Sequence, residues 1–404
     1  MVVLWLVVAL LALPCLAATI VVALRFRPGS GTSGSDTPTG AAGLSVVVPI
    51  KGVDAHTESN LDALFASRVP VPVEYLIAME SPDDPAHEVA TRVQQRHPGV
   101  ASSIVISGPA GSRMGKQHNL AAGFARARYD TIASMDADVK VDPDTLAIGL
   151  AHLSRPDAGV AYFLPQYVGP GPLGGLLVAL YSNYYYQLNM ASLALSSNAG
   201  FITGGLWLMS DEARRRIGDL SQFGTTVSDD AAIGRAVVAA GLRTILIPRT
   251  VRIRYEDLGL VGGARHVLKW LTLLRAEGLP TYLAIAGSWH PLLLAVVAAV
   301  VAMLAGVGVT PALLAIAAVA ALRLASGLVL HARAYGWRGV GTIAWLPVYE
   351  LLAVPVLYTR GLFARELTWR GRRYRIGRGG TILSATDTDP GPPSVPAAPE
   401  GTAR

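Results

Sequence analysis

The sequence predicts an α/β domain, built on a mostly parallel sheet, with apolar helices near both ends of the chain. From residue 44 to about 166, short apolar runs rich in β-branched residues alternate with helix-like segments. This alternation is typical of strands buried in a parallel sheet and connected by helices. Two other stretches, 2–24 and 291–322, contain no charged residue and are long enough to cross a bilayer.

Composition restricts the class of protein further. Of the 404 residues, 51% are hydrophobic and 15% are charged, which is too apolar for an ordinary soluble enzyme. The single cysteine, Cys15, excludes a disulfide framework and a thiolate metal site. The net charge of +6 comes from arginines that flank the apolar segments, where cytoplasmic basic residues are expected. We therefore expect membrane contact and no nucleic-acid partner.

The central domain is predicted over 44–283, and its elements follow in order along the chain. We expect strands at 45–49, 74–79, 103–106 and 130–135, and helices at 57–67, 86–96 and 116–127, with Pro143 at the start of another helix. Ligands bind outside the carboxyl ends of the strands in such sheets. Lys51, Glu80 and the Asp136-Ala137-Asp138 tripeptide all follow strand ends, so we expect them to meet.

The flanking segments are assigned from hydropathy and charge. Residues 1–27 are predicted to be an uncleaved transmembrane anchor, because no basic residue precedes its apolar run. Arg25 and Arg27 then place the following domain in the cytoplasm, at a bacterial-type inner membrane. The remaining segments are a flexible linker (28–43), interfacial helices (173–195), two transmembrane helices (284–331), a broken or interfacial apolar element with an Arg-rich cytoplasmic segment (340–383) and a disordered tail (384–404).

Asp136 and Asp138 end the fourth predicted strand. Residues two apart on a strand point to the same face, and two carboxylates so close repel one another unless a cation lies between them. Mg²⁺ takes one or two carboxylates and completes its coordination with water and phosphate oxygens. The pair therefore predicts a metal-bound diphosphate, although the same spacing also occurs in plain surface turns.

A second acidic pair, Asp229-Asp230, precedes a helix-compatible run at 231–240. Helix starts favour Ser and Asp on structural grounds alone, and this explanation is about as strong as a functional one for Asp229. It is weaker for Asp230, because a third set of residues, His266-Val267-Leu268-Lys269-Trp270, follows about 36 residues later on another predicted helix.

These motifs, in this order, resemble those of membrane-bound family 2 glycosyltransferases with a GT-A fold, a Rossmann-like mixed sheet. More narrowly, the chain is similar to the ceramide glucosyltransferases of family 21 and their bacterial relatives over about 44–383. The residues that carry the resemblance are Pro49-Ile50-Lys51-Gly52-Val53-Asp54, Asp83-Asp84-Pro85-Ala86, Gly115-Lys116-Gln117-His118-Asn119-Leu120, Asp136-Ala137-Asp138, Thr203-Gly204-Gly205, Asp229-Asp230 and Trp369-Arg370-Gly371-Arg372-Arg373-Tyr374-Arg375.

The match departs from the family pattern in three places. His266 stands where Gln or Arg is usual, and Lys269 stands where Arg is usual; Lys lacks the planar fork of Arg. The acidic residue after the second strand has two candidates, Glu80 and Asp83. The acceptor region, 173–203, resembles the family in its general character but not in its motifs, so the resemblance does not identify the lipid acceptor.

The chemistry and the resemblance agree on the expected roles. Asp136 and Asp138 would hold Mg²⁺ or Mn²⁺ at the diphosphate of a UDP-sugar, with Asp136 alternatively on the ribose. Asp230, next to Asp229, would be the general base for the acceptor hydroxyl. Trp270 would pack near the acceptor or sugar, or serve as an interfacial anchor, and Lys269 would offset charge on the leaving UDP. The other donor-binding candidates are Lys51, Glu80, Asp83, Lys116, Asn119, Arg372 and Arg375.

The resulting prediction is an inverting glycosyltransferase that moves glucose from UDP-glucose to the primary hydroxyl of ceramide or a similar membrane lipid. The alternative is transfer of N-acetylglucosamine or galactose to a hopanoid, diacylglycerol or polyprenyl phosphate. A processive polysaccharide synthase is disfavoured, because two or three spans offer little material for a translocation channel. A non-catalytic membrane scaffold would leave Asp136, Asp138 and Asp230 dispensable.

Overall fold

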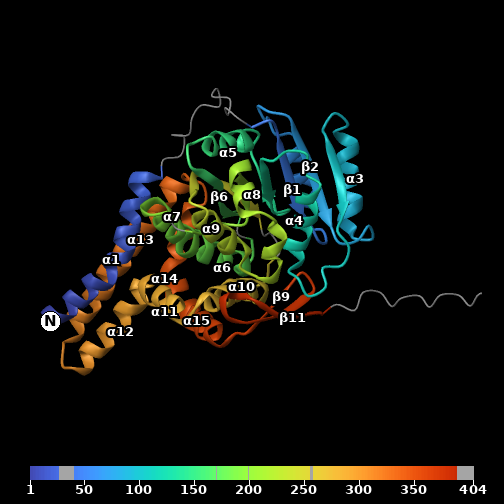
Figure 1. Ribbon diagram of the computed structural model, residues 1–404. Coiled ribbons are helices and arrows are strands. Elements are labelled where there is room, and N and C mark those ends of the chain that lie inside the picture. The colour runs from blue at the N-terminus through green and yellow to red at the C-terminus, as the bar shows by residue number, and fades with distance from the viewer. Residues whose placement is uncertain (27–40, 170, 199, 255–257, 389–404) are drawn as a thin grey trace, which may run out of the picture.

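The computed structural model describes residues 1–26, 41–169, 171–198, 200–254 and 258–388 (Figure 1). The predicted linker, apart from 41–43, and the predicted tail beyond 388 lie outside the described residues. The prediction of a disordered tail from 384 is wrong at its start, because residues 384–387 belong to strand β11 (Ile382–Asp387).

An eight-stranded sheet forms the centre of the molecule, in the order β3-β2-β1-β4-β7-β6-β8-β5. β1 pairs in parallel with β2 and β4, β2 with β3, and β6 with β8, whereas β7 runs antiparallel between β4 and β6. The predicted mixed, mostly parallel α/β sheet is therefore confirmed. The strands are β1 (Leu44–Pro49), β2 (Val73–Met79), β3 (Ser102–Ile106), β4 (Ile132–Met135), β5 (Val139–Lys140), β6 (Ala158–Val168), β7 (Leu206–Met209) and β8 (Arg243–Arg254).

Helices cover the sheet, and local sequence explains their limits. Asp84 begins α3 (Pro85–Arg96) by accepting a hydrogen bond from the backbone N–H of Ala86, with Pro85 at the first helical position. Gly123 lets α4 (Gly115–Ala125) lie directly on β1, because a Cβ there would overlap the side chain of Val47. The other helical segments of this domain are α2 (Thr57–Phe65), α5 (Thr145–Leu153), α8 (Asp211–Ile217), η2 (Leu220–Thr225), α9 (Asp229–Ala239) and α10 (Leu260–Glu277).

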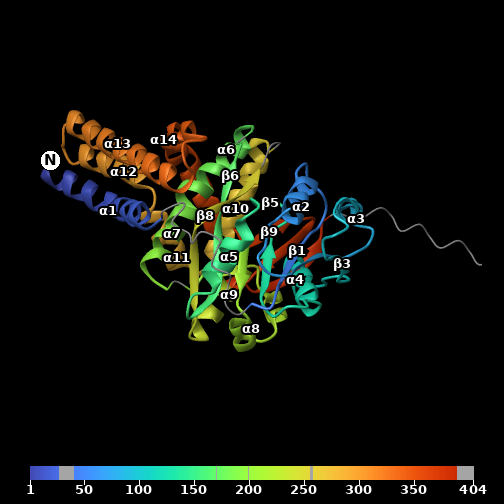
Figure 2. The same cartoon turned by 90° about the horizontal axis from the view of Figure 1, so that it is seen from above.

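Three helices in the described part of the chain are long and apolar enough to cross a membrane: α1 (Val2–Arg25), α13 (Val309–Ala334) and the helical run Val340–Phe363. A fourth is possible by length if α11 (Leu279–Ser288) and α12 (Pro291–Leu304), which meet at 77°, count as one span. Helices α1, α12 and α13 pack together and extend away from the sheet (Figure 2).

Two apolar segments differ from their sequence-based predictions. We expected a full span near 288–307, but α12 has only 14 residues, roughly 21 Å against a ~30 Å hydrocarbon core, because Pro291 starts a new helix there. We expected a broken element at 340–359, but helical turns continue through η3 (Val340–Trp345), α14 (Leu346–Val348), η4 (Tyr349–Ala353) and α15 (Val354–Phe363). Pro347 and Pro355 sit at first-turn positions, where proline is tolerated.

The predicted interfacial segment forms α6 (Leu173–Tyr181), the π-turn η1 (Ser182–Tyr186) and α7 (Gln187–Ser196). α6 packs closely on α10, because Gly174 and Gly263 leave no room for a Cβ on either helix. The tyrosines of η1 diverge. Tyr184 hydrogen-bonds His331 at 2.7 Å and Tyr185 donates to Glu350 at 3.0 Å, whereas Tyr186 lines the central cavity.

Glu350 is a fully buried carboxylate that connects four elements. Its Oε1 accepts from the backbone N–H of Leu292 at 2.6 Å, at the start of α12, and its Oε2 accepts from Tyr185 of η1 and from Nε of Arg323 on α13 at 3.4 Å. Arg323 is also buried, and its guanidinium lies 4.6 Å from the centre of the Tyr185 ring. The pair therefore ties the apolar helices to the π-turn.

Replacing Glu350 with Ala is expected to destabilise the protein strongly, because it leaves the buried Arg323 charge uncompensated. Losing one partner of a buried pair costs about 3–5 kcal/mol, whereas apolar replacement of both can be nearly neutral. Thermal unfolding in detergent should thus show a large fall in Tm for Glu350→Ala and a smaller fall for the double variant Arg323→Met, Glu350→Met. A double variant less stable than the single one would contradict this view.

A second, three-stranded sheet near the C-terminus closes one side of the domain. Its strands are β9 (Glu366–Trp369), β10 (Arg372–Ile376) and β11 (Ile382–Asp387), ordered β11-β10-β9. It is anchored to the segment before α9, because the N–H of Val227 donates to the carbonyl of Gly380 at 2.9 Å and Thr226 bridges Thr381. The sheet thus reaches the residues that lead into Asp229-Asp230.

Candidate active site

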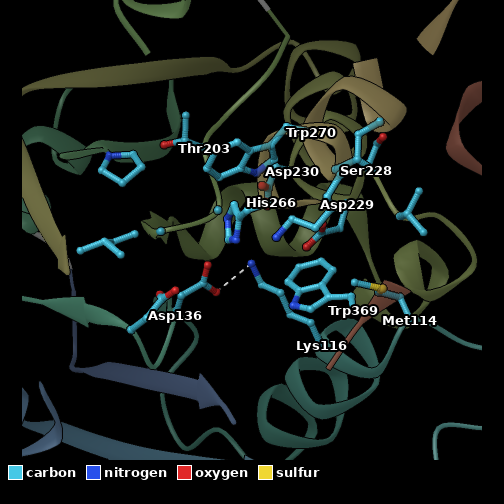
Figure 3. Close-up of a pocket in the computed structure, with 18 of the residues that line it drawn as sticks. Met114, Lys116, Asp136, Thr203, Ser228, Asp229, Asp230, His266, Trp270 and Trp369 are labelled. Carbon is cyan, nitrogen blue, oxygen red and sulfur yellow. Dashed lines mark ion pairs between the residues drawn. The ribbon is translucent and has the colours of Figure 1, made fainter. Parts of the chain in front are cut away.

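A cavity of about 1010 Å³ opens at the carboxyl ends of β1, β2 and β4, where the sequence places its polar residues. Lys51 follows β1, Glu80 follows β2, and Asp136 and Asp138 follow β4, and all four line the cavity. Figure 3 shows Asp136 and Lys116 on one side of it and Asp229, Asp230, His266 and Trp270 facing them. The structure thus brings together residues from every quoted motif of the central domain except Asp83-Asp84-Pro85-Ala86.

Lys116 of α4 is the cation at the centre of this cavity. Its Nζ lies 2.8 Å from Oδ1 of Asp136 (Figure 3). Gly204 lets it approach the second acidic pair, since a Cβ at Gly204 would stand 2.8 Å from both Lys116 Nζ and Asp230 Oδ1. Burial lowers the pKa of Lys116, but the charges of Asp136, Asp230 and Asp229 outweigh it, so the net pKa is raised and the ammonium persists.

The two carboxylates of the Asp-x-Asp motif are held by backbone contacts. Asn60 donates to the carbonyl of Ala137 at 3.1 Å, and the N–H of Asp136 donates to Gly205 at 2.9 Å. Burial raises the pKa of Asp136 to about 6, against the opposing charge of Lys116, and burial also raises the pKa of Asp138. Both carboxylates therefore need positive charge nearby to stay ionised.

Asp138 fits a divalent cation. Its Oδ1 is buried and has no hydrogen-bond partner among the described residues, and hard cations prefer such carboxylate oxygens. No group of three His, Cys, Asp or Glu side chains converges on one point within the described ranges. A cation here would thus complete its coordination with donor phosphates and water, as Mg²⁺ commonly does.

The two aspartates at the start of α9 have different surroundings. Asp229 is buried and accepts a hydrogen bond from the side-chain amide of Gln117, which ties α9 to α4. Asp230 lines the cavity, and its Oδ1 is buried without a hydrogen-bond partner in the described structure. Burial, and then the charge of Asp229, raise the pKa of Asp230 well above its usual range. The raised pKa makes the Asp230 carboxylate a stronger proton acceptor than an ordinary aspartate.

On the donor side, Glu80 is the centre of a polar network. Its carboxylate lies 3.7 Å from Lys51 Nζ and accepts from the backbone of Ala110 at 3.2 Å and from Arg372 at 3.1 Å. Asp83, the other candidate, is exposed and is not among the described residues that line the cavity. The structure therefore brings Glu80 to the site and leaves Asp83 outside.

Asn119 reaches the cavity wall, but its amide is engaged internally. It donates to the carbonyl of Ile50 at 3.2 Å and accepts from Ser107 at 2.7 Å. These bonds position the loop after β1 rather than present the amide to a ligand.

Helix α10 presents one face to the cavity, carrying His266, Lys269 and Trp270. The Trp270 ring stacks on Tyr181 with centroids 5.5 Å apart and meets His266 edge-on at 4.4 Å. Lys269 Nζ lies 4.4 Å from the centre of the Trp369 ring, a cation–π distance. Burial lowers the pKa of Lys269 to about 8, although the charges of Asp138 and Asp136 oppose it.

Activity that needs the Lys269 cation is expected to fall as pH rises through about 8, because the folded-state pKa is lowered and the charged form persists only below it. The loss should approach tenfold per pH unit on the alkaline limb of kcat/KM. In Lys269→Arg, the guanidinium stays charged, so this limb should move to higher pH. A limb that stays unchanged in that variant would assign the titration to another group.

The C-terminal sheet contributes arginines, although not all that the sequence indicated. Arg372 lines the cavity, whereas Arg375 is exposed and absent from the described lining, because alternate residues of β10 face opposite sides. Arg370, at the β9–β10 turn, lines the cavity together with Arg372. It has φ of +47° beside Gly371 at +75°, as a two-residue hairpin turn requires, and its charge acts on Asp138.

The sequence-based assignments of roles omit four cavity or supporting residues, although all four lie inside motifs quoted for the resemblance: Gln117, Gly204, Trp369 and Arg370. The left-handed conformation of Arg370 is rare for a side chain of its size. In the sequence, only the Gly that follows Arg370 indicated a turn at this position.

Comparison with known proteins gives a consistent result. The model of glycosyl transferase family 21 matches residues 5–382. Ceramide glucosyltransferase 1 of Caenorhabditis elegans is 21% identical over 235 residues, covering 57% of this chain and 49% of the relative. Ceramide glucosyltransferase of Komagataella phaffii is 28% identical over 243 residues, covering 51% and 46%. The chain thus spans about half the length of these curated relatives.

Among solved structures, a mannosyltransferase from Pyrobaculum calidifontis in complex with GDP-Man and Mn²⁺ is similar, with a TM-score of 0.49 and 18% identity. The match covers 88% of this chain and 99% of that one.

Proposed function

Because the chain belongs to glycosyl transferase family 21, we propose that it is an inverting transferase that moves glucose from UDP-glucose to the primary hydroxyl of ceramide or a similar membrane lipid. The observation that carries the proposal is the arrangement around Lys116. This cation separates Asp136, beside the orphan carboxylate oxygen of Asp138, from Asp230, whose own oxygen also lacks a partner in the described structure. One cavity therefore offers carboxylates that could hold a cation at the donor diphosphate and, nearby, a carboxylate that could take a proton from the acceptor.

Asp230 is the general base of this proposal. Its carboxylate takes the proton of the acceptor hydroxyl, the hydroxyl oxygen forms the new bond to the anomeric carbon, and the bond from that carbon to the diphosphate oxygen breaks. UDP leaves with the electron pair on the opposite face, so the configuration inverts. Asp229 and Lys116 hold Asp230 in place, through Gln117 and through charge.

The donor side binds the nucleotide and its diphosphate. Asp138 and Asp136 would hold Mg²⁺ or Mn²⁺, which supplies positive charge to the diphosphate. Lys269, Arg370 and Arg372 add fixed positive charge around the leaving group. Glu80, with Lys51, is placed to contact the nucleoside.

The acceptor side is apolar. The same cavity is lined by Met190 and Leu193 of α7, Leu274 of α10 and Ile285 of α11. α7 packs on α1, a helix that is apolar enough to span a membrane. A lipid hydroxyl would enter here from the bilayer. We place the catalytic domain at the cytoplasmic face of a bacterial-type inner membrane, because the basic residue Arg25 ends α1.

The test is product formation by the purified, detergent-solubilised chain. UDP-glucose, UDP-galactose and UDP-N-acetylglucosamine would each be offered with Mg²⁺ or Mn²⁺ and with ceramide, a hopanoid, diacylglycerol or polyprenyl phosphate, and glycolipids read by mass. Glucosylceramide is the expected product. A sugar on another lipid would retain the mechanism and change the acceptor, whereas no product and no UDP binding would contradict the proposal.

A further inference from the structure

Glu277, the last residue of α10, stands out on the acceptor side of the cavity. It lines the cavity on the same face of α10 as Trp270 and Leu274, since residues three, four and seven apart share a helix face. Its Oε1 is buried and has no hydrogen-bond partner among the described residues. Burying a carboxylate oxygen without a hydrogen bond costs free energy, unless a ligand or another group supplies a hydrogen-bond donor.

The other oxygen of Glu277 is engaged, which fixes the orientation of the group. Oε2 accepts from Nη1 of Arg235 on α9 at 3.1 Å. Arg235 itself lies against Gly200, where a Cβ would stand 3.3 Å from the Arg235 Cα. The ion pair therefore spans from the helix of Asp230 to the end of α10, and it leaves Oε1 as the oxygen without a partner in the described structure.

The surroundings of Glu277 are the apolar walls of the acceptor side. Leu273 and Leu274 precede it on α10, and Thr281 and Ile285 of α11 follow. Tyr186 lines the same cavity as Glu277 and the proposed base. Burial raises the pKa of Tyr186, and the negative charges of Asp230 and Glu277 raise it further. Glu277 thus lines the same cavity as Asp230, and the charges of both act on Tyr186.

We propose that Glu277 determines acceptor specificity by accepting a hydrogen bond from an N–H or O–H of the lipid headgroup other than the hydroxyl that receives the sugar. The inference rests on the proposed function. Ceramide carries such donors, an amide N–H and a second hydroxyl, whereas 1,2-diacylglycerol has only ester oxygens beside its reacting hydroxyl. A carboxylate at this position also disfavours an acceptor with a phosphate headgroup, through like-charge repulsion.

The test compares two acceptors in wild type, Glu277→Leu and Glu277→Gln. With short-chain ceramide, Glu277→Leu should lower kcat/KM about 10- to 100-fold, the effect of one hydrogen bond to a charged group. With short-chain 1,2-diacylglycerol, the kcat/KM of Glu277→Leu should stay within about twofold of the wild-type value. Glu277→Gln keeps an oxygen that can accept a hydrogen bond, so its kcat/KM with ceramide should lie between the values of the wild type and Glu277→Leu. The matched control is Glu212→Leu, which replaces a surface glutamate of α8 that pairs with Arg215 and Arg216. This variant should leave kcat/KM unchanged with both acceptors.

Binding of the same two lipids, followed by calorimetry in the presence of UDP, separates the inference from the function on which it rests. Selective loss of ceramide affinity in Glu277→Leu, with no transfer by the wild type, would support the specificity role and reject the proposed reaction. Transfer to ceramide that is equally fast in wild type and Glu277→Leu, or an equal loss with both acceptors, would overturn the inference and leave the reaction standing. Retained UDP affinity in each variant shows that it is folded.

Discussion

Replacing Asp230 with Asn is expected to lower kcat by about 10²–10⁴-fold, because the variant cannot take the proton of the acceptor hydroxyl. The side chain keeps its shape, and Lys116 and Asp136 still face each other at 2.8 Å, so UDP affinity should stay within a few-fold. Steady-state transfer rates and UDP titration of the same preparation measure both quantities.

Asp229→Asn is the matched control for this experiment, since the two carboxylates are neighbours on the first turn of α9. Asp229 accepts from Gln117 and does not need to exchange a proton, so its variant should lose far less activity than Asp230→Asn. Full activity in Asp230→Asn, or an equal loss in both variants, would reject Asp230 as the base.

Replacing Asp138 with Asn is the second change with a large expected effect. It removes the buried carboxylate oxygen that lacks a partner in the described structure, and with it a charge that a divalent cation requires. We expect kcat/KM to fall on the order of 10²–10³-fold, matching several kcal/mol of charge stabilisation. UDP binding should need a much higher Mn²⁺ concentration for half-saturation. Chelation of the metal in wild type should reproduce the loss of UDP affinity.

Asp83→Asn is the control here, because it removes a carboxylate that the sequence favoured equally with Glu80 for donor contact. The structure places Asp83 on the surface, so its variant should keep kcat/KM within about twofold. A loss as large as that of Asp138→Asn would show that the donor extends past Glu80. Unchanged metal dependence in Asp138→Asn would move the cation to other ligands.

Local patterns were sufficient for the first four strands of the sheet and for the helices between them, whereas β5 to β8 and the C-terminal sheet were not predicted. The apolar runs at 45–49 and 74–79 became β1 and β2 almost residue for residue, because buried parallel strands are apolar on both faces. Lys51, Glu80 and Asp138 follow strands that share one sheet, so their meeting follows from the topology alone.

Long-range packing decided what those patterns left open. Lys116 and Asp230 are 114 positions apart, and only the absence of a side chain at Gly204 lets both approach the same point. The alternation of side chains along β10 could be predicted, but which face turns inward depends on how the C-terminal sheet docks, through Gly380 and Thr381, on Thr226 and Val227. This docking selected Arg372 over Arg375. Helix breaks in the apolar segments likewise depend on where Pro291 and Pro347 fall relative to helix starts.

The sequence by itself determined the α/β class, the apolar helices and the order of the acidic motifs, because these depend on period, hydropathy and neighbouring residues. The tertiary structure alone decided which charges meet. It set Lys116 between Asp136 and Asp230, brought Arg370 to the cavity and left one oxygen of Glu277 without a donor in the described structure. Electrostatic interactions depend on distance and burial in space, and neither quantity is written in the spacing of residues along the chain.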